Sequence, residues 1–286
     1  MVFKEILNKA AYSNIIIGLG PVSLSYMTAV FLRIETDMFF LLIPFLITFF
    51  VYSINRFTDI REDMINNPER TEFIKNKGNY FLFGAVISLI GAFLLSLFHS
   101  VLTFMVIAIP AILVTIYSFK MLPSINKKRL KDLFLLKNLT VSFGWSLIPV
   151  YVAAYANVFN IGLIVLFCFI FLRILIGVIM FDIRDVIGDK IEGIITIPIK
   201  YGIKNSKYII LFLHVLSVLI LISGYFIANF SPLLVLAIII IISILTAFYY
   251  INIEKDTDKK FLCNVIVDGE YVILGVLALI LSVILS

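Results

Sequence analysis

The chain contains 286 residues, of which 62% are hydrophobic and 14% are charged, and its formal net charge is +5. Soluble domains average about half apolar and about a quarter charged residues, so this composition excludes an ordinary soluble protein and indicates a polytopic membrane protein. Membrane proteins collect such a basic surplus in their cytoplasmic loops, so we expect no nucleic-acid binding. The two cysteines and two histidines are isolated and support neither a disulfide framework nor a zinc site.

Nine apolar segments follow one another along the chain, each long enough to cross a bilayer as a helix. Six of them form three pairs, because three long apolar runs are each broken by a few polar residues. We therefore expect an all-α bundle of nine transmembrane helices, and a single domain over residues 1–286. The expected spans are residues 12–32, 38–59, two within 79–119, two within 138–181, two within 208–252, and 262–285.

Lysine and arginine lie almost entirely on one side of the predicted bundle. Of the 23 basic residues, Arg33 alone lies at the opposite face and Arg173 lies within a span. By the positive-inside rule the basic side faces the cytoplasm, so we expect a multi-pass cell-membrane protein with its N-terminus and charged loops in the cytoplasm. The charged loops are expected at residues 60–78, 120–137, 182–207 and 254–260.

Polar residues cluster where the second span ends. Asn55, Asp59 and Asp63 follow one another at four-residue spacing. On a helix such residues fall on nearly one face, with a drift of about 40° per step. They are therefore predicted to converge on one ligand.

A second acidic cluster lies where the sixth span ends. Asp182, Asp185 and Asp189 follow one another at spacings of three and four residues. The two clusters occupy corresponding places in two halves of the chain. They predict one shared site at the cytoplasmic side of the membrane.

Grouped carboxylates at a membrane interface usually mark a function, because they are costly to leave unpaired. Oxygen ligands suit Mg²⁺, which is held by one or two carboxylates while water and substrate phosphates fill its other positions. So many acids fit about two or three Mg²⁺ ions bridging a diphosphate better than one ion. The alternatives are helix caps or surface ion pairs, and a cation-coupled transporter, although transporter sites usually lie near the bilayer midplane.

The two motifs together resemble the signature motifs of the UbiA superfamily of intramembrane prenyltransferases. The resemblance implies an all-helical bundle around a central cavity that opens to the cytoplasmic side and to lipid. It extends beyond the acids to Ile65, Asn66, Pro68 and Arg70 after the first motif, and to Gly188, Lys190, Gly193, Thr196 and Pro198 after the second.

The resemblance also implies an activity, which is Mg²⁺-dependent transfer of a polyprenyl group from a polyprenyl diphosphate donor to a lipophilic acceptor. The donor would ionise towards an allylic cation that the acceptor attacks. Asp59, Asp63, Asp185 and Asp189 would be metal-binding and catalytic, and Asn55 and Asp182 would support the metal and diphosphate site, Asp182 as a further metal ligand. Other candidate diphosphate contacts are Arg61, Arg70, Lys137, Asn138, Arg184 and Lys190.

The acceptor stays open at this point. Arg70 is followed by Thr71, whereas the common pattern has proline there. An aromatic ring, as in quinone synthesis, and a prenylated glyceryl phosphate, as in archaeal lipid synthesis, remain the candidates, while carotenoid extension and haem farnesylation fit less well. Asp268 and Glu270, near the start of the last span, are further candidates to face the cavity.

Overall fold

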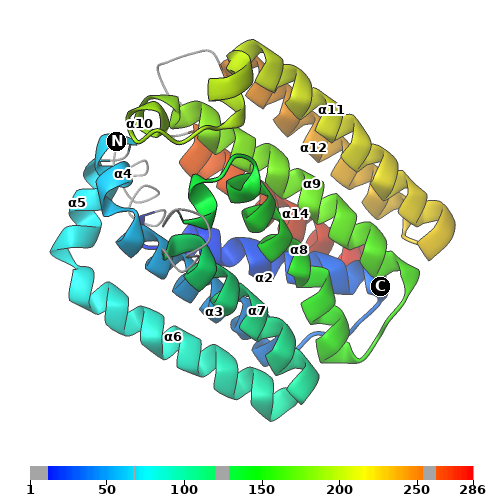
Figure 1. Cartoon of the computed structure of the whole chain (residues 1–286). Helices are drawn as coiled ribbons and strands as arrows, with labels where there is room; N and C mark the ends of the chain where they lie inside the picture. The colour runs from blue at the N-terminus through cyan, green and yellow to red at the C-terminus, as the bar shows by residue number, and fades with distance from the viewer. Residues whose placement is uncertain (1–11, 67, 120–128, 254–261, 286) are drawn as a thin grey trace.

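The computed structural model describes residues 12–66, 68–119, 129–253 and 262–285, and this part of the chain is helical without a strand (Figure 1). Nine of its helices are long and apolar enough to cross a membrane, as the composition predicts, so the protein is a multi-pass membrane protein. They are α2 (Ile15–Leu32), α3 (Met38–Thr58), α6 (Gly78–His99), α7 (Val101–Ser118), α8 (Leu136–Ala156), α9 (Ile161–Arg184), α11 (Ile197–Ala228), α12 (Pro232–Asn252) and α14 (Asp268–Leu285). The shorter elements are α4 (Ile60–Asn66), α5 (Pro68–Asn76), the 3-10 helix η1 (Leu130–Asp132), α10 (Val186–Ile191) and the π-helical turn η3 (Leu262–Val267).

Polar residues end the helices within the long apolar runs. Ser100 lies between α6 and α7, and its hydroxyl accepts a hydrogen bond from the backbone N–H of Thr103. Asn157 and Asn229 end α8 and α11 in the left-handed conformation, which asparagine tolerates better than most residues. These breaks satisfy backbone groups that a helix end leaves open, so each apolar run turns back as a pair of antiparallel helices.

The stretch 60–78, expected as a charged loop, is instead mostly helical. It forms α4 and α5, and Pro68 occupies the first position of α5, where a missing N–H costs nothing. Thr71 and Ile74 of α5 are buried against the bundle. A short helix satisfies its own backbone hydrogen bonds, which favours it over an open loop beside a membrane.

The boundary of the seventh span also differs from expectation. α11 begins at Ile197 rather than near residue 208, because Pro198 favours a helix start and lysines do not prevent one. The chain bends at Gly202, whose φ of 81° is accessible to glycine at little cost. Of the other expected loops, residues 254–260 and the first half of 120–137, residues 120–128, lie outside the described residues.

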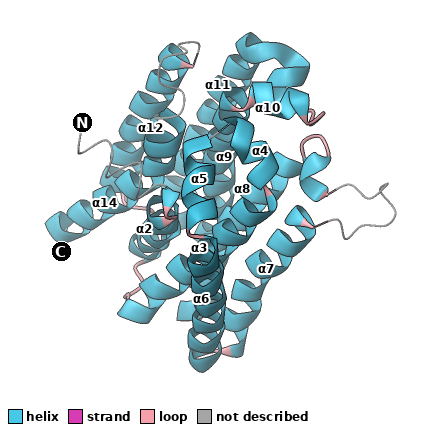
Figure 2. Ribbon diagram, turned by 90° about the vertical axis from the view of Figure 1, so that its left-hand side faces the viewer, coloured by secondary structure: helices cyan, strands magenta, loops and turns pink. Residues whose placement is uncertain are grey.

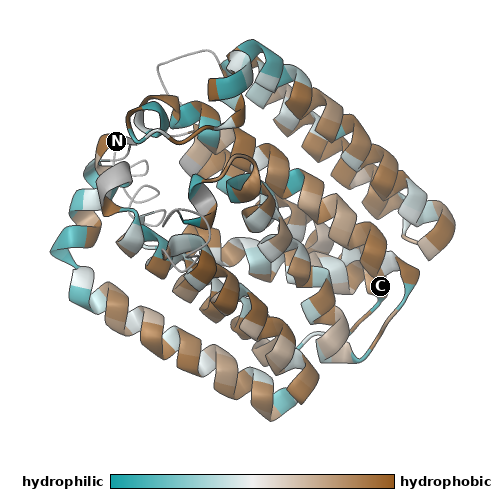
Figure 3. Cartoon of the chain, viewed as in Figure 1, coloured by the Kyte–Doolittle hydropathy of each residue, from teal (hydrophilic) through white to brown (hydrophobic). Residues whose placement is uncertain are grey.

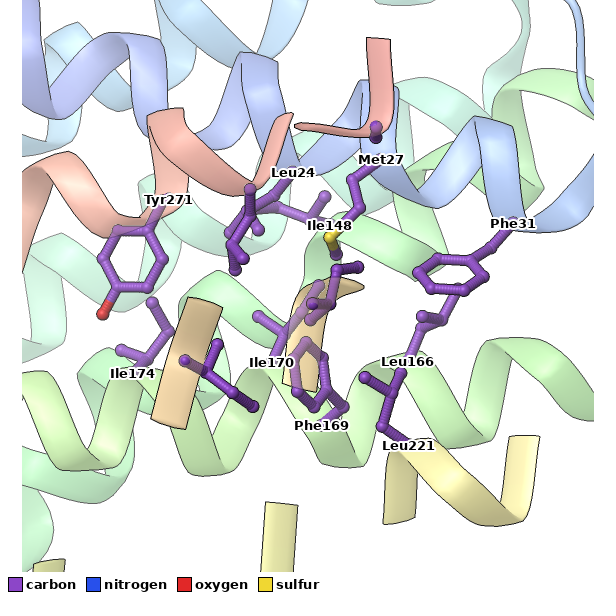
Figure 4. Packing of buried hydrophobic residues seen from close by; sticks show 14 of the residues in the cluster. Leu24, Met27, Phe31, Ile148, Leu166, Phe169, Ile170, Ile174, Leu221 and Tyr271 are labelled. Atoms are coloured by element: carbon purple, nitrogen blue, oxygen red, sulfur yellow. The ribbon is translucent and has the colours of Figure 1, made fainter. Parts of the chain in front are cut away.

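The central helix of the bundle is α9 (Figure 1). Most of its side chains are buried. Leu166, Phe169 and Ile170 of α9 pack with Leu24 and Met27 of α2 in one apolar cluster (Figure 4). Lipid tails are as apolar as leucine, so close packing rather than exclusion of water holds such helices together.

Two further contacts place α14 against the rest of the bundle. Gly275 lies so close to Ser23 of α2 that an added Cβ would be 2.4 Å from the serine Cβ. Glu270 forms a buried ion pair with Arg173 of α9, with Nη2 2.6 Å from Oε1, and accepts a hydrogen bond from the Tyr249 hydroxyl at 2.6 Å. The first turn of α14 is therefore fixed to α9 and α12 within the apolar part of the bundle.

One end of the bundle is polar. The hydrophilic residues of α4, α5 and α10 gather there, whereas the long helices are largely hydrophobic (Figure 3). The three short helices lie at the same end in the rotated view as well (Figure 2). Both acidic motifs are at this end, because α4 and α10 carry the last acid of each.

Candidate active site

The two acidic motifs have the same local structure, a long helix followed by a bend and a short helix. Asp59 ends α3 with φ −104° and ψ 11°, and Asp185 ends α9 with φ −95° and ψ 6°. The backbone N–H of Asp63 still donates to the Asp59 carbonyl at 2.8 Å, and that of Asp189 donates to the Asp185 carbonyl at 2.9 Å. Near-helical spacing therefore continues through both bends, as the sequence predicts.

The motifs meet around one cavity at the polar end. The short helices α4 and α10 pack against each other. Between the motifs lies a cavity of about 190 Å³, which we call the polar compartment. Its charged lining residues are the carboxylates Asp59, Asp63, Asp185, Asp189 and Asp268 and the cations Arg56, Arg70, Lys137 and Arg184.

The first-motif acids are both paired with cations. Arg70 donates to Asp63 Oδ1 at 2.7 Å. Arg129 lies 3.8 Å from Asp59 Oδ1, which also accepts a hydrogen bond from the Thr58 hydroxyl at 3.1 Å. These cations stabilise the two carboxylates, whose negative charge is costly to remove from water without a partner.

The second-motif acids are held differently from one another. Although burial opposes ionisation of Asp185, two hydrogen bonds from Arg184, at 2.6 and 2.7 Å, hold the pKa of that carboxyl below its ordinary value. Burial raises the pKa of Asp189 to about 6, an effect that Lys137, 3.5 Å away, only partly offsets. Asp189 is therefore the motif acid with the weaker compensation.

The residues of the polar compartment fit Mg²⁺ that is shared with a substrate. Among the described residues no three or more His, Cys, Asp or Glu side chains gather closely enough to hold an ion by themselves, so the acids do not converge on one point. Spread carboxylates suit an ion whose other positions are taken by water and phosphate oxygens. Asn55 Oδ1 is buried in the compartment wall and accepts no hydrogen bond from described residues, so it is an oxygen that a hard cation would satisfy.

An apolar cavity adjoins the polar compartment. It measures about 140 Å³, lies between α3, α7 and α8, and reaches from Asn55 to Pro44 along α3, which is about 16 Å of helix. We call it the apolar compartment. Near its far end Pro44 frees the carbonyl of Phe40, which accepts a hydrogen bond from the Tyr151 hydroxyl at 2.8 Å.

Aromatic residues lie where the two compartments join. Tyr52, Tyr117 and Trp145 line both, together with Asn55 and Val141. The Trp145 indole N–H donates to the Tyr52 hydroxyl oxygen at 3.0 Å, and the two rings meet edge to face at 6.4 Å. The junction is therefore lined by aromatic rings that also carry polar groups.

The candidate residues from the sequence divide into two sets. Asn55, Arg70, Lys137 and Arg184 line the polar compartment beside the four acids. Asp182 and Asn138 do not line it and are both buried: Asn138 donates to Asp182 at 2.7 Å, and Asp182 lies 3.0 Å from the Lys137 amine. Asp182, which Asn138 holds, therefore fixes the position of the Lys137 amine.

Three other candidates have different outcomes. Lys190 is exposed and is not among the lining residues of the polar compartment. The side chain of Arg61 lies outside the described part of the chain. Asp268 lines the compartment, whereas Glu270, two residues later, points to Arg173 instead.

Sequence reasoning did not assign cavity roles to Arg56, Tyr52 or Trp145. Tyr52 and Arg56 lie on α3 with Asn55, and Tyr52 is one turn before Asn55. Extending the first motif back by one helical turn would therefore have identified Tyr52. Trp145 and Arg129 had no such local signal. Their places depend on how α8 and η1 pack against the two motifs.

Comparisons with known proteins agree with this architecture. A model of the UbiA prenyltransferase family matches residues 19–265. A digeranylgeranylglyceryl phosphate synthase from Methanobrevibacter smithii is 30% identical over 237 residues, which are 77% of this chain and 80% of that protein.

Solved structures share the fold at low identity. One, from work on digeranylgeranylglyceryl phosphate synthase in membranes, aligns with a TM-score of 0.61 and 24% identity over 98% of this chain and 97% of that one. A UbiA homolog from Archaeoglobus fulgidus, bound to GPP and Mg²⁺, aligns with a TM-score of 0.68 and 14% identity over 96% of each chain.

Proposed function

The chain belongs to the UbiA prenyltransferase family and is a prenyltransferase, and from this we propose that it moves a polyprenyl group from a diphosphate donor to a lipophilic acceptor with the help of Mg²⁺. One observation carries the proposal. A compartment lined by both acidic motifs adjoins an apolar, aromatic-lined compartment. A prenyl diphosphate has the same two parts, one highly charged and one apolar.

The polar compartment would hold the diphosphate. Asp59, Asp63, Asp185 and Asp189, with Asn55, are the residues that would hold Mg²⁺, which when bound neutralises negative charge on the departing diphosphate. The arginines and Lys137 would exchange their present carboxylate partners for phosphate oxygens, to which guanidinium groups donate pairs of hydrogen bonds. Magnesium is supported by this donor set and by the Mg²⁺ in the Archaeoglobus fulgidus homolog.

The apolar compartment would hold the prenyl chain and exclude water from the allylic cation. Water in this space would capture the cation and give an alcohol, so a dry wall protects the transfer. Tyr52 and Trp145, at the junction, would present their rings to the cation where the bond to the diphosphate breaks.

For the acceptor we propose a glyceryl phosphate lipid that already carries one prenyl chain. The name of the Methanobrevibacter smithii relative describes a product with two geranylgeranyl groups on glyceryl phosphate. An enzyme making it would add a geranylgeranyl group to a free glycerol hydroxyl. An aromatic quinone precursor is the other candidate that the assay below tests.

The same proposal includes the placement of the protein. One domain over residues 1–286 would lie in the cell membrane with the polar end in the cytoplasm, as the excess of lysine and arginine on that side favours. The acids lie at this end of the bundle beside the short charged helices, and no observation favours a cation-coupled transporter, whose site is usually near the midplane.

The test is transfer by the purified protein in detergent. Labelled geranylgeranyl diphosphate and Mg²⁺ are supplied with either a prenylated glyceryl phosphate or an aromatic acceptor. We expect a labelled lipid with the first acceptor and none when EDTA replaces Mg²⁺. The proposal would be contradicted if the protein did not bind the donor and released no diphosphate with either acceptor.

Variants of the two motifs sharpen the test. Asp59→Ala and Asp185→Ala should each lower turnover by roughly 10²–10³-fold or more, because each removes a group that stabilises the leaving charge. The matched control is Asp37→Ala, an exposed carboxylate at the opposite end of α3. Turnover in either motif variant equal to that of the control would refute the site.

A further inference from the structure

The fifth carboxylate of the polar compartment, Asp268, belongs to neither acidic motif. It is the first residue of α14, on the last span, whereas the motifs follow α3 and α9. The four motif acids each have a hydrogen bond or ion pair with a neighbouring residue. Among the five carboxylates that line the compartment, Asp268 is the one that forms no hydrogen bond or ion pair within the described part of the chain.

Several contacts fix Asp268 at this place. Two residues later Glu270 is held by Arg173 and Tyr249, so the first turn of α14 has little freedom. Tyr271 packs against Trp145 with ring centroids 5.1 Å apart, and it reaches towards Ile174 of α9 (Figure 4). A half-buried carboxylate without a partner, on a helix turn that is otherwise tightly anchored, is costly unless a ligand uses it.

The surroundings of Asp268 place it near the junction of the two compartments. Tyr271, three residues after Asp268 in α14, lines the polar compartment and packs against Trp145, which lines both compartments. Arg56, Arg70 and Arg184 line the polar compartment together with Asp268. If the diphosphate lies in one compartment and the prenyl chain in the other, the carbon that joins them lies at this junction.

The transfer has a proton to remove at that point. An acceptor hydroxyl that attacks carbon 1 of the prenyl chain becomes a protonated ether and must lose its proton. The motif acids are committed to cations and to the proposed metal site. Asp268 is the remaining carboxylate of the polar compartment.

We propose that Asp268 is a catalytic residue, the base that accepts the proton of the acceptor hydroxyl, an inference that rests on the proposed function. The acceptor oxygen forms a bond to carbon 1, and the bond from carbon 1 to the diphosphate oxygen breaks, with its electron pair leaving on the diphosphate. The hydroxyl proton passes to a carboxylate oxygen of Asp268. Water then takes that proton and restores the carboxylate.

This role separates Asp268 from the motif acids experimentally. A motif acid acts on ionisation of the donor, whereas Asp268 acts only after an acceptor is present. Ionisation can be followed without an acceptor by using donor labelled with ¹⁸O at the bridging position. Reversible breaking of the carbon–oxygen bond moves the label to non-bridging positions.

The deciding variant is Asp268→Asn, which keeps the size of the side chain and removes the base. We expect transfer to prenylated glyceryl phosphate to fall by about 10²–10⁴-fold, the usual contribution of a general base. Mg²⁺-dependent donor binding and ¹⁸O exchange should stay within about twofold of wild type, which also shows that the variant is folded. Asp268→Glu, which retains a carboxylate, should recover part of the transfer.

The matched control is Asp37→Asn, the same substitution on the opposite face, where asparagine is an equally good helix cap. It should leave transfer, binding and exchange unchanged. Wild-type transfer by Asp268→Asn would overturn the proposal. So would a parallel loss of ¹⁸O exchange or of donor binding, because Asp268 would then act on ionisation or hold the metal. Absence of exchange and transfer in the wild-type protein would instead refute the proposed function itself.

Discussion

The buried ion pair between Arg173 and Glu270 makes a quantitative prediction about stability. Both side chains are almost inaccessible, at 1% and 2% exposure, and two contacts of 2.6 and 2.8 Å join the guanidinium to one carboxylate oxygen. Glu270→Gln keeps the shape but leaves Arg173 without its counter-charge inside the apolar bundle. We expect a loss of about 3–5 kcal/mol, the usual cost of removing one partner of a buried pair.

Replacing both partners should cost less than replacing one. Arg173→Met combined with Glu270→Leu removes both charges, and a buried pair exchanged for apolar residues is often neutral or stabilising. Tyr249 and His214 lose partners in the double variant, which we expect to cost about 1–3 kcal/mol in all. The predicted order of stability is therefore wild type, double variant, Glu270→Gln.

The assay is the half-life of the folded protein in detergent at a fixed elevated temperature, since membrane proteins often unfold irreversibly. Trp145, the single tryptophan, lies in the cavity wall and reports loss of the fold by its fluorescence. If the loss falls on the unfolding rate, Glu270→Gln should unfold roughly 10²-fold faster or more. A double variant less stable than Glu270→Gln would refute the reasoning, because the cost would then not come from an unpaired charge.

Two further predictions concern the cavity. Gly144 lines the apolar compartment, and open space lies where its Cβ would be. Gly144→Phe should fill the compartment and lower the ratio of geranylgeranyl transfer to dimethylallyl transfer by about tenfold or more. Gly144→Ala, the control, should leave this ratio unchanged. Competition between the two donors measures this, and an unchanged ratio in Gly144→Phe would exclude the compartment as the chain site. Burial raises the pKa of Asp189 to about 6, so this carboxylate is protonated below pH 6 and cannot then bind a metal. The Mg²⁺ concentration that gives half-maximal activity should therefore rise about tenfold per pH unit below 6 and should not change with pH above 7. Magnesium titrations at pH 5, 6 and 7.5 check it, and an equal requirement at all three values would contradict the role of Asp189.

The sequence alone determined the parts of this protein that depend on local chemistry. Long apolar runs must be helices in a membrane, because only a helix forms all of its backbone hydrogen bonds within a single segment. Nine spans therefore follow from composition and length. Likewise, the four-residue spacing of Asn55, Asp59 and Asp63 sets a common helix face whether or not a bend intervenes. The sequence also predicted that the two acidic clusters would meet, since both follow spans that end on the same side.

Only the tertiary structure decided which side chains share the cavity. Asp182 belongs to the second motif by spacing, yet helix packing turns it to Asn138 and Lys137 and away from the polar compartment. Asp268 and Glu270 are equivalent by sequence, but only the packing of α14 against α9 brings one to the cavity and the other to Arg173. Spacing along a helix sets the relative directions of its side chains, whereas neighbouring helices set how that helix is rotated about its axis. A charged side chain inside an apolar bundle is found beside a partner of opposite charge.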